Sequence, residues 1–351
     1  MIDVLVVEDS RVIRNYLISV LQTDPEIRIC DTAASGEEAL ASVDRHRPDV
    51  ILMDLHLPGI DGFETTRRIM SSNPVPILVC TASTQFDQVQ TAMRALEAGA
   101  LAVLKKPSGP LDPNAEAEAA AIIKTLKLMS EVKVVRRWNR APAVAEPAPF
   151  DVAGHKTAIV AIGASTGGPP VVLQILSGLP TDFPAPILVV QHIASGFTAG
   201  FAEWLGAASR LQVHVALGGE IPLPGHVYVA PDDHHLRVGL RGELQATRDE
   251  PHNGMRPSVG VLFRSVAERF GRRAIGVLLT GMGRDGAQEL KLMADMGALT
   301  VAQTEESCVV FGMPAEAVRL GAARFVLPPQ KIAELLSTAA RRATSKEEAD
   351  G

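Results

Sequence analysis

At 351 residues the chain is longer than one ordinary domain and fits two. Hydrophobic residues make up 46% of it and charged residues 21%, so two sizeable cores are possible, and a net charge of −6 argues against a dominant nucleic-acid-binding surface. No apolar run approaches the ~20 residues that span a bilayer, and no signal sequence is visible, so we expect a cytoplasmic protein without membrane insertion.

The first part of the chain alternates apolar runs with helical patterns. Strands are expected at Ile2–Val7, Ile27–Ala33, Val50–Met53, Ile77–Cys80 and Ala102–Leu104. Helices are expected to begin near Ser10, Gly36, Gly62, Phe86 and Asp112, the last with Asp112 as N-cap and Pro113 in its first turn. Five such units predict a doubly wound parallel sheet, which binds ligands at the carboxyl ends of its strands.

Polar side chains stand at those strand ends. Glu8 and Asp9 follow the first strand, Asp54 the third, Thr81 the fourth and Lys106 the fifth. Three carboxylates at one point repel one another unless a cation joins them, and hard oxygen ligands of this kind suit Mg²⁺. A hydroxyl and an ammonium opposite them suit an incoming phosphoryl group. One such residue would be ordinary solvated surface, but five at matching strand ends indicate a site.

This constellation, with the segment Asp54–Gly62 and the pair Lys106-Pro107, resembles the receiver domain of bacterial response regulators. The resemblance implies a flavodoxin-like fold in which Asp54 accepts a phosphoryl group from a chemotaxis-type histidine kinase. It also implies that Glu8, Asp9 and Asp54 hold Mg²⁺ and that Thr81 and Lys106 sense the phosphate. Lys105 is an alternative to Lys106, but the residue directly before Pro107 matches the family pattern.

Residues 130–154 read as a linker. A basic run up to Arg140 is followed by the proline-rich segment Ala141–Pro149, a composition typical of an extended, semi-rigid spacer. The basic residues could contact nucleic acid or form a solvated helix end. No helix-turn-helix pattern follows them, which weighs against a DNA-binding response regulator.

The second part of the chain centres on a serine. The buried strand Ala158–Ile162 leads into Gly163–Gly168, and a helix follows at Val171–Leu176. The G-x-S-x-G spacing around Ser165 is that of a nucleophile elbow, in which backbone N–H groups can stabilise an oxyanion. A dinucleotide-binding loop is a weaker reading, because Ser165 occupies its second glycine position. A structural turn rich in small residues is the third.

The remaining pattern is again α/β. It predicts strands at Pro186–Val190, Gln212–Ala216, His226–Ala230, Ala274–Leu279, Leu299–Ala302 and Arg324–Leu327, a hairpin from His235–Val238 to Leu244, and a helix at Ala287–Met296. We therefore expect a second doubly wound parallel sheet, of Rossmann-like form.

Three of these units end in Ser165, His192 and Asp285. A neutral imidazole can take the proton of a serine hydroxyl, and a carboxylate on the other ring nitrogen fixes the tautomer and stabilises the imidazolium. The chain order serine, histidine, aspartate differs from that of α/β-hydrolases. Three other loop histidines are alternatives to His192, namely His234, His235 and His252. Only His192 directly follows a strong apolar strand.

Five motifs of this second part are similar to those of the protein-glutamate methylesterases of bacterial chemotaxis, in which a receiver precedes the catalytic domain. They are Gly163–Gly168, Gln191-His192, Arg256–Val259, Leu279–Ala287 and Ser307–Pro314. The resemblance implies hydrolysis of glutamate γ-methyl esters on methylated chemoreceptors, with release of methanol, and deamidation of receptor glutamines.

In this reading Ser165 is the nucleophile, His192 the base and Asp285 its orienting carboxylate, with the backbone N–H of Met282 a candidate for the oxyanion hole. The ester chemistry needs no cofactor. Two other classes remain open. A phosphorylation-controlled docking module would not need the three catalytic residues, and a nucleotide-binding domain would need an acidic ribose ligand where Gln191 stands.

The expected organisation is a receiver at residues 1–129, the linker at 130–154, a catalytic domain at 155–341 and a tail at 342–351. A short linker can hold the receiver near the catalytic edge of the second sheet. We therefore expect the unphosphorylated receiver to inhibit the esterase, and phosphorylation of Asp54 to relieve that inhibition.

Overall fold

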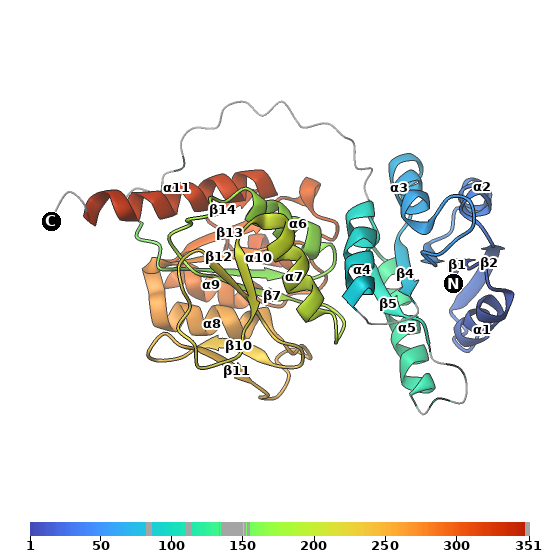
Figure 1. The fold of residues 1–351 in the computed structure, drawn as a ribbon, viewed down its shortest axis with the longest axis horizontal. Helices are drawn as coiled ribbons and strands as arrows, with labels where there is room; N and C mark the ends of the chain where they lie inside the picture. Colours follow the sequence, from blue (N-terminus) through green and yellow to red (C-terminus); the bar gives the residue numbers. More distant parts are fainter. Residues whose placement is uncertain are drawn as a thin grey trace. The chain divides into compact units, whose positions relative to one another are not determined.

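The computed structural model describes residues 1–81, 86–107, 109, 112, 114–132, 134, 150, 152 and 155–347. The chain divides into two compact units, Met1–Arg140 and Ala141–Gly351, each of which is treated by itself below (Figure 1). Both are parallel α/β sheets covered by helices, which confirms the predicted fold class. In the described part of the chain, no helix has the length and apolar character needed to span a membrane. Most of the predicted linker lies outside the described residues, so the domain boundaries stay a prediction.

The first unit has one five-stranded parallel sheet in the order β2-β1-β3-β4-β5. Helices α1 and α5 lie together on one face, and α2, α3 and α4 cover the other (Figure 1). The strands are β1 Ile2–Val7, β2 Ile27–Ala33, β3 Val50–Met53, β4 Ile77–Thr81 and β5 Ala102–Lys105, and the helices are α1 Arg11–Leu21, α2 Gly36–His46, α3 Gly62–Ser72, α4 Phe86–Ala98 and α5 Ala115–Ser130. All five predicted strands are therefore confirmed.

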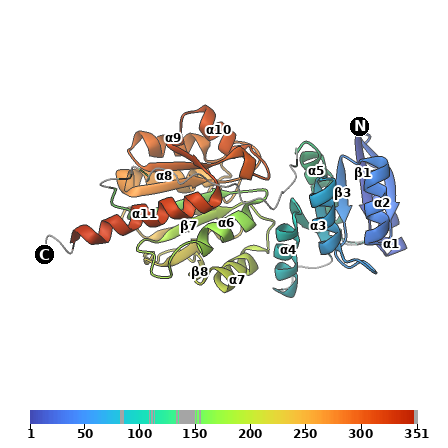
Figure 2. The ribbon, with the colours of Figure 1, turned by 90° about the horizontal axis from the view of Figure 1, so that it is seen from above.

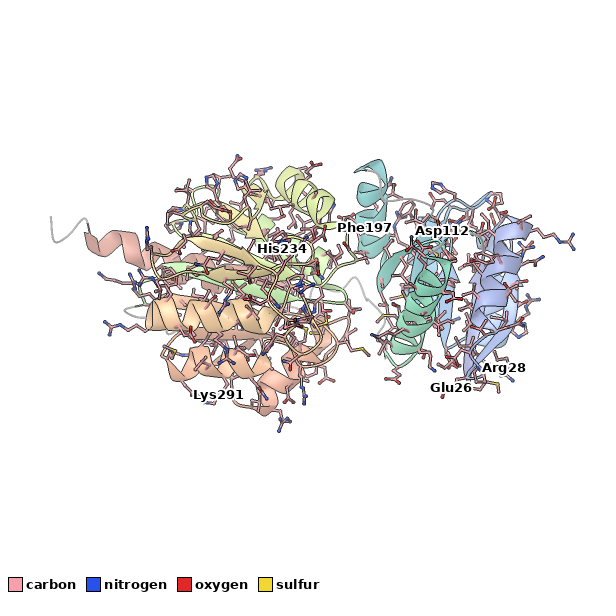
Figure 3. All side chains as sticks on the ribbon, turned by 90° about the horizontal axis from the view of Figure 1, so that it is seen from below. Glu26, Arg28, Asp112, Phe197, His234 and Lys291 are labelled. Carbon is pink, nitrogen blue, oxygen red and sulfur yellow. The ribbon has the colours of Figure 1, made fainter. Side chains whose placement is uncertain are left out.

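The start of α5 differs from the prediction. The helix begins at Ala115, with Asn114 as its N-cap, and the Asp112 carboxylate (labelled in Figure 3) accepts a hydrogen bond from the Asn114 amide at 2.8 Å. Asp112 thus closes a local turn before the helix instead of capping it. Short acidic side chains can bond to nearby backbone amides in either arrangement, so the two roles compete. The predicted Pro113 lies outside the described residues.

The second unit has a seven-stranded sheet in the order β14-β13-β12-β6-β7-β9-β8, in which every pairing is parallel. A separate antiparallel hairpin, β10-β11, matches the predicted one and lies against α8. The strands are β6 Ile159–Ala164, β7 Ile187–Gln191, β8 Gln212–Val215, β9 His226–Val229, β10 His235–Val238, β11 Leu244–Thr247, β12 Ala274–Leu278, β13 Leu299–Gln303 and β14 Phe325–Leu327.

Helices cover both faces of this sheet. In Figure 2, α6, α7 and α11 lie on one side of the strands and α8, α9 and α10 on the other. Their bounds are α6 Gly168–Ser177, α7 Thr198–Ser209, α8 Val259–Phe270, α9 Ala287–Asp295, α10 Met313–Arg319 and α11 Pro329–Glu347, with 3-10 turns η1 Gly271–Arg273 and η2 Glu305–Ser307. The apolar patterns considered above do not predict α7, α8, α10 or α11, and the N-terminus of α8 borders the site described below.

Both sheets have a topological switch point. The chain runs outward from β1 to β2 and then crosses to β3, and in the second unit it runs outward from β6 before returning to β12 on the other side. Loops at the carboxyl ends of such strand pairs diverge and leave room for a ligand. Ser165 directly follows β6, and the register of β6 with β7 pairs Ala164 with Gln191, so Ser165 and His192 emerge side by side.

Gly163 tests how tightly this region is packed. A Cβ placed on Gly163 would lie 2.2 Å from Cγ1 of Val259, a fully buried residue. Gly163→Ala should therefore lower the free energy of unfolding by about 1–3 kcal/mol, as overpacked cores do. Gly206→Ala in α7 is the matched control, because its Cβ would meet no atom closer than 3.7 Å and should add about 0.5–1 kcal/mol by stiffening the helix. Calorimetric unfolding of both variants checks the pair, and equal stability of the two would contradict it.

Candidate functional sites

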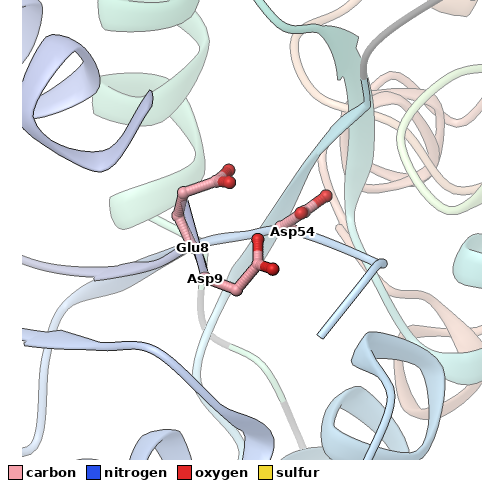
Figure 4. A group of neighbouring side chains, drawn as sticks. All are labelled: Glu8, Asp9 and Asp54. Atoms are coloured by element: carbon pink, nitrogen blue, oxygen red, sulfur yellow. The ribbon is translucent and has the colours of Figure 1, made fainter. Parts of the chain in front are cut away.

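Three carboxylates meet at the switch point of the first sheet. Glu8 and Asp9 follow β1, Asp54 follows β3, and one ligand oxygen from each lies within 4.8 Å of the other two (Figure 4). Glu8 and Asp54 are buried, at 1% and 3% exposure, whereas Asp9 is exposed. Hard carboxylate oxygens in this number suit Mg²⁺, so the donor set present fits the ion implied by the sequence.

Lys106 completes this cluster. Its Nζ lies 2.7 Å from Oε2 of Glu8 and 3.0 Å from Oδ2 of Asp54. Burial raises the pKa of the Glu8 carboxyl, and although the bond from Lys106 opposes this, the nearby Asp54 charge adds to it. Burial acts to lower the pKa of Lys106, but its two carboxylate partners outweigh that effect and raise it. The ammonium is therefore held in place as a cation.

Thr81 is the last residue of β4 and is buried. Its carbonyl accepts a hydrogen bond from the Lys106 amide at 2.6 Å, so the ends of β4 and β5 are joined at this point. The structure thus brings the five residues selected from the sequence to one edge of the sheet. The side chain of Lys105, the alternative to Lys106, lies outside the described residues.

In the second unit, His192 and Asp285 are in direct contact. His192 Nε2 lies 3.0 Å from Oδ2 of Asp285, and both side chains are buried, at 8% and 6% exposure. Because Asp285 engages Nε2, Nδ1 is the ring nitrogen left for Ser165; in serine proteases the carboxylate holds Nδ1 instead. The hydroxyl of the half-buried Ser165 has no hydrogen-bond partner among the described residues.

Asp285 is held by the N-terminus of α8. Its Oδ1 accepts hydrogen bonds from the Ser258 hydroxyl at 2.8 Å and the Gly260 amide at 3.2 Å, and its Oδ2 accepts one from the Val259 amide at 2.7 Å. Burial acts to raise the pKa of Asp285, but the bond and charge of His192, followed by the bonds from Ser258 and Val259, lower it overall. A helix N-terminus favours negative charge, so Asp285 stays ionised.

The serine turn is fastened to the loop that follows β12. The Ser165 amide donates to the Thr280 carbonyl at 3.0 Å, and the Thr280 hydroxyl donates to the Thr166 carbonyl at 3.0 Å. A Cβ on Gly281 would lie 2.7 Å from Cβ of Ser165, so this loop runs directly against the serine. Within the described chain, the backbone N–H groups of Thr166 and Met282 have no acceptor and remain available to an oxyanion.

The competing histidines have other partners. His234 (Figure 3) is bonded at Nδ1 to the Asp232 carbonyl, at 2.7 Å, and at Nε2 to Arg248, at 3.1 Å. His235 is buried, with Nε2 on the Glu250 carbonyl and Nδ1 accepting from the Ser258 amide.

His252 is connected to Asp285 by way of the Ser258 hydroxyl and not by a hydrogen bond of its own. Its Nδ1 lies 3.2 Å from the Ser258 hydroxyl and 3.9 Å from Oδ1 of Asp285. Of the four candidate histidines, His192 alone is in hydrogen-bond contact with Asp285.

The site also contains residues that sequence reasoning did not assign a role. Ser258 and the α8 amides lie in the motif Arg256–Val259 or just beyond it, where the sequence motif by itself does not reveal a helix start. The sequence does contain a sign of this helix start. Serine is a common N-cap residue, and Ser258 precedes apolar residues at helical spacing, namely Val259, Leu262, Phe263 and Val266. Thr280 and Gln191 also belong to sequence motifs, but their contacts with the serine turn depend on tertiary structure.

Comparison with known proteins covers nearly the whole chain. A family model described as CheB methylesterase matches residues 160–336, and one described as response regulator receiver domain matches residues 4–114. Two similar proteins are named protein-glutamate methylesterase/protein-glutamine glutaminase. That of Nitrosospira multiformis is 53% identical and that of Syntrophus aciditrophicus 52%, each over 96% of this chain and 96% and 97% of the relative.

Among solved structures, the second unit resembles the CheB methylesterase catalytic domain of Thermotoga maritima. The two are 41% identical, with a TM-score of 0.51, and the match covers 52% of this chain and 98% of that domain. The chain thus matches its relatives over their full organisation, not over one domain alone.

The lowered pKa of Asp285 has a consequence for stability. Folding favours the ionised form of Asp285, because its pKa is lower in the folded state than the ordinary value of 3.8. Its contribution to the free energy of unfolding is therefore complete above pH 3.8 and is lost as pH falls through the lower pKa of the folded state. Asp285→Asn should lower the Tm at neutral pH, and the difference from wild type should shrink as pH falls below the ordinary pKa of 3.8. Thermal melting at each pH measures this. Asp295→Asn, at the exposed end of α9, should show no such pattern, and a Tm difference that grows in acid would contradict the assignment.

Proposed function

The chain belongs to the family of protein-glutamate methylesterases/protein-glutamine glutaminases that carry a response-regulator receiver domain, and we propose that it hydrolyses glutamate γ-methyl esters of chemoreceptors under the control of that receiver. The single observation that best supports the chemistry is the buried His192–Asp285 pair, placed at the strand end beside Ser165. A docking module would not need an ionised carboxylate held by three further hydrogen bonds behind a histidine.

The residues support a two-step acyl transfer. Ser165 Oγ attacks the ester carbonyl while His192 takes its proton, and the imidazolium so formed is stabilised by Asp285. The C–O bond to methoxide then breaks, and His192 returns the proton, so methanol leaves and Ser165 carries the acyl group. Water, deprotonated by His192, cleaves the acyl-enzyme to a glutamate. The same steps on a glutamine side chain would release ammonia.

Charge on the carbonyl oxygen needs donors that do not have to reorganise. The N–H groups of Thr166 and Met282 come from the two glycine-rich turns, which lie against each other at Ser165. We assign them as the oxyanion hole, and fixed donors of this kind are each worth about a hundredfold or more in rate.

In the receiver, Asp54 would accept a phosphoryl group from a chemotaxis-type histidine kinase. Glu8, Asp9 and Asp54 would hold Mg²⁺, whose charge offsets that of the carboxylates and of the incoming group. Lys106 is placed to bind the phosphoryl oxygens once Asp54 is modified, and Thr81 lies at the adjoining strand end. Because substrate and kinase belong to cytoplasmic signalling, we place the protein in the cytoplasm.

The esterase assignment predicts which residue is indispensable. Ser165→Ala should reduce methanol release from methylated receptor by at least about a thousandfold, because it removes the covalent step. Asp285→Asn should cost less, since it leaves both Ser165 and His192 in place. Gas-chromatographic methanol release measures both, and circular dichroism checks the fold. Undiminished turnover by Ser165→Ala would overturn the mechanism.

The receiver assignment predicts phosphorylation control. A small phosphodonor with Mg²⁺ should raise the methanol release of the wild type, and Asp54→Asn should stay at the basal rate because it offers no acceptor. A tenfold activation corresponds to only about 1.4 kcal/mol between inhibited and active states. Chelation of Mg²⁺ should abolish the response of the wild type and leave Asp54→Asn unchanged. Activation of the Asp54→Asn protein by the donor would show that control runs through another group.

A further inference from the structure

One buried amide touches the main chain of both reacting residues. Gln191, the last residue of β7, is 4% exposed, and its Nε2 donates to the Ser165 carbonyl at 2.8 Å and to the His192 carbonyl at 2.9 Å. An amide nitrogen has two N–H groups, so both bonds can form at once. We propose that Gln191 is a positioning residue that sets the nucleophile turn and the base relative to each other, an inference that rests on the proposed function of Ser165 and His192.

The bond to Ser165 also aims an oxyanion donor. A peptide unit is planar, so the Ser165 carbonyl and the Thr166 N–H belong to one rigid plane and point in opposite directions. The Ser165 carbonyl accepts two hydrogen bonds, one from the Gln191 side chain and one from the Gly168 amide at 2.8 Å. Fixing that oxygen therefore fixes the direction of the free Thr166 N–H, the group immediately after the nucleophile.

The bond to His192 acts on the other partner. The His192 amide donates to the Ala164 carbonyl at 2.9 Å, which ties one side of the residue to β6. Gln191 holds the other side through the His192 carbonyl. The His192 N–H is thus bonded to β6, and the His192 carbonyl is bonded to the same amide nitrogen that binds the Ser165 carbonyl, so both main-chain groups of the residue that carries the imidazole are held.

The remaining atom of the amide argues against a purely stabilising role. Gln191 Oε1 is buried and has no partner in the part of the chain that the structure describes. It faces Gly168, where a Cβ would lie 2.2 Å away. A buried polar atom without a partner costs about 1–3 kcal/mol, so an amide is a poor choice here for stability alone. What it provides is two donors on one nitrogen, aimed at two catalytic residues.

The experiment uses the full-length protein with two substitutions of similar size. Gln191→Met fills the same space with no donor, and Gln191→Glu keeps the shape but offers acceptors to two carbonyls. Each is assayed for methanol release from methylated receptor, giving kcat and KM separately, and for the rate at which a fluorophosphonate labels Ser165. Thr300→Val is the matched control: this buried hydroxyl on β13 accepts a hydrogen bond from the Arg324 amide and bonds to neither turn.

For both Gln191 variants we expect kcat and the labelling rate to fall about 10–100-fold, while KM stays within about twofold of wild type. This fall is a part of the rate enhancement that a correctly oriented oxyanion-hole donor provides. Thr300→Val should retain wild-type kcat even if its Tm falls. The inference is overturned if the Gln191 variants keep kcat and the labelling rate within about twofold of wild type. It is also overturned if Thr300→Val loses as much kcat as the Gln191 variants for the same fall in Tm, because the loss would then reflect stability alone. In either case a wild type that releases methanol, with Ser165→Ala inactive, leaves the proposed function standing. A wild type that neither releases methanol nor is labelled overturns the proposed function itself.

Discussion

The second unit depends on one buried charge. Asp285 is held ionised in an apolar sheet edge because the first amides of α8, the Ser258 hydroxyl and His192 all meet its two oxygens. A carboxylate buried without these partners would take up a proton, and His192 would lose the group that supports its charge. The packing of α8 and the position of the His192 ring are thus parts of one electrostatic arrangement, in which the N-terminus of α8 faces the Asp285 carboxylate.

The two units share one topological feature, a switch point in a parallel sheet, although their strand orders differ. Each places its polar residues where strand order reverses, at carboxyl ends that loops leave open. In the first unit those ends carry carboxylates and Lys106, a set that suits a metal ion and a phosphoryl group. In the second they carry a hydroxyl, an imidazole and a carboxylate, a set suited to acyl transfer. The parallel sheet supplies the location, and the few residues past each strand end decide the reaction.

Loops of the second site are made rigid by buried side-chain bonds. The Thr280 hydroxyl accepts from the amides of Val309 and Val310 and donates to Thr166, and Gln303 accepts from the Thr280 amide while its own amide donates to Ser307. Such groups are costly to bury and are fully used here, with Oε1 of Gln191 an exception. The result is a set of turns whose free N–H groups point in fixed directions, as stabilisation of a developing oxyanion requires.

How much of this follows from the sequence is clear from individual residues. Apolar runs predict both parallel sheets and place Glu8, Asp54, Ser165 and His192 at strand ends, because strand periodicity and glycine turns are local properties of the chain. The choice of Ser165 and His192 as reacting residues also needed the resemblance to the methylesterases. The start of α5 differs from the prediction because the Asp112 carboxylate accepts a hydrogen bond from the Asn114 amide in a local turn, and the helix begins only after Asn114, which makes no side-chain capping bond. Tertiary structure alone decided that Asp285 rests on α8 and binds Nε2 of His192, and that Gln191 joins two carbonyls. Apart from the bond between Gln191 and the adjacent His192, these contacts join residues 25 to 93 positions apart. No local pattern encodes which distant donor a buried oxygen will meet.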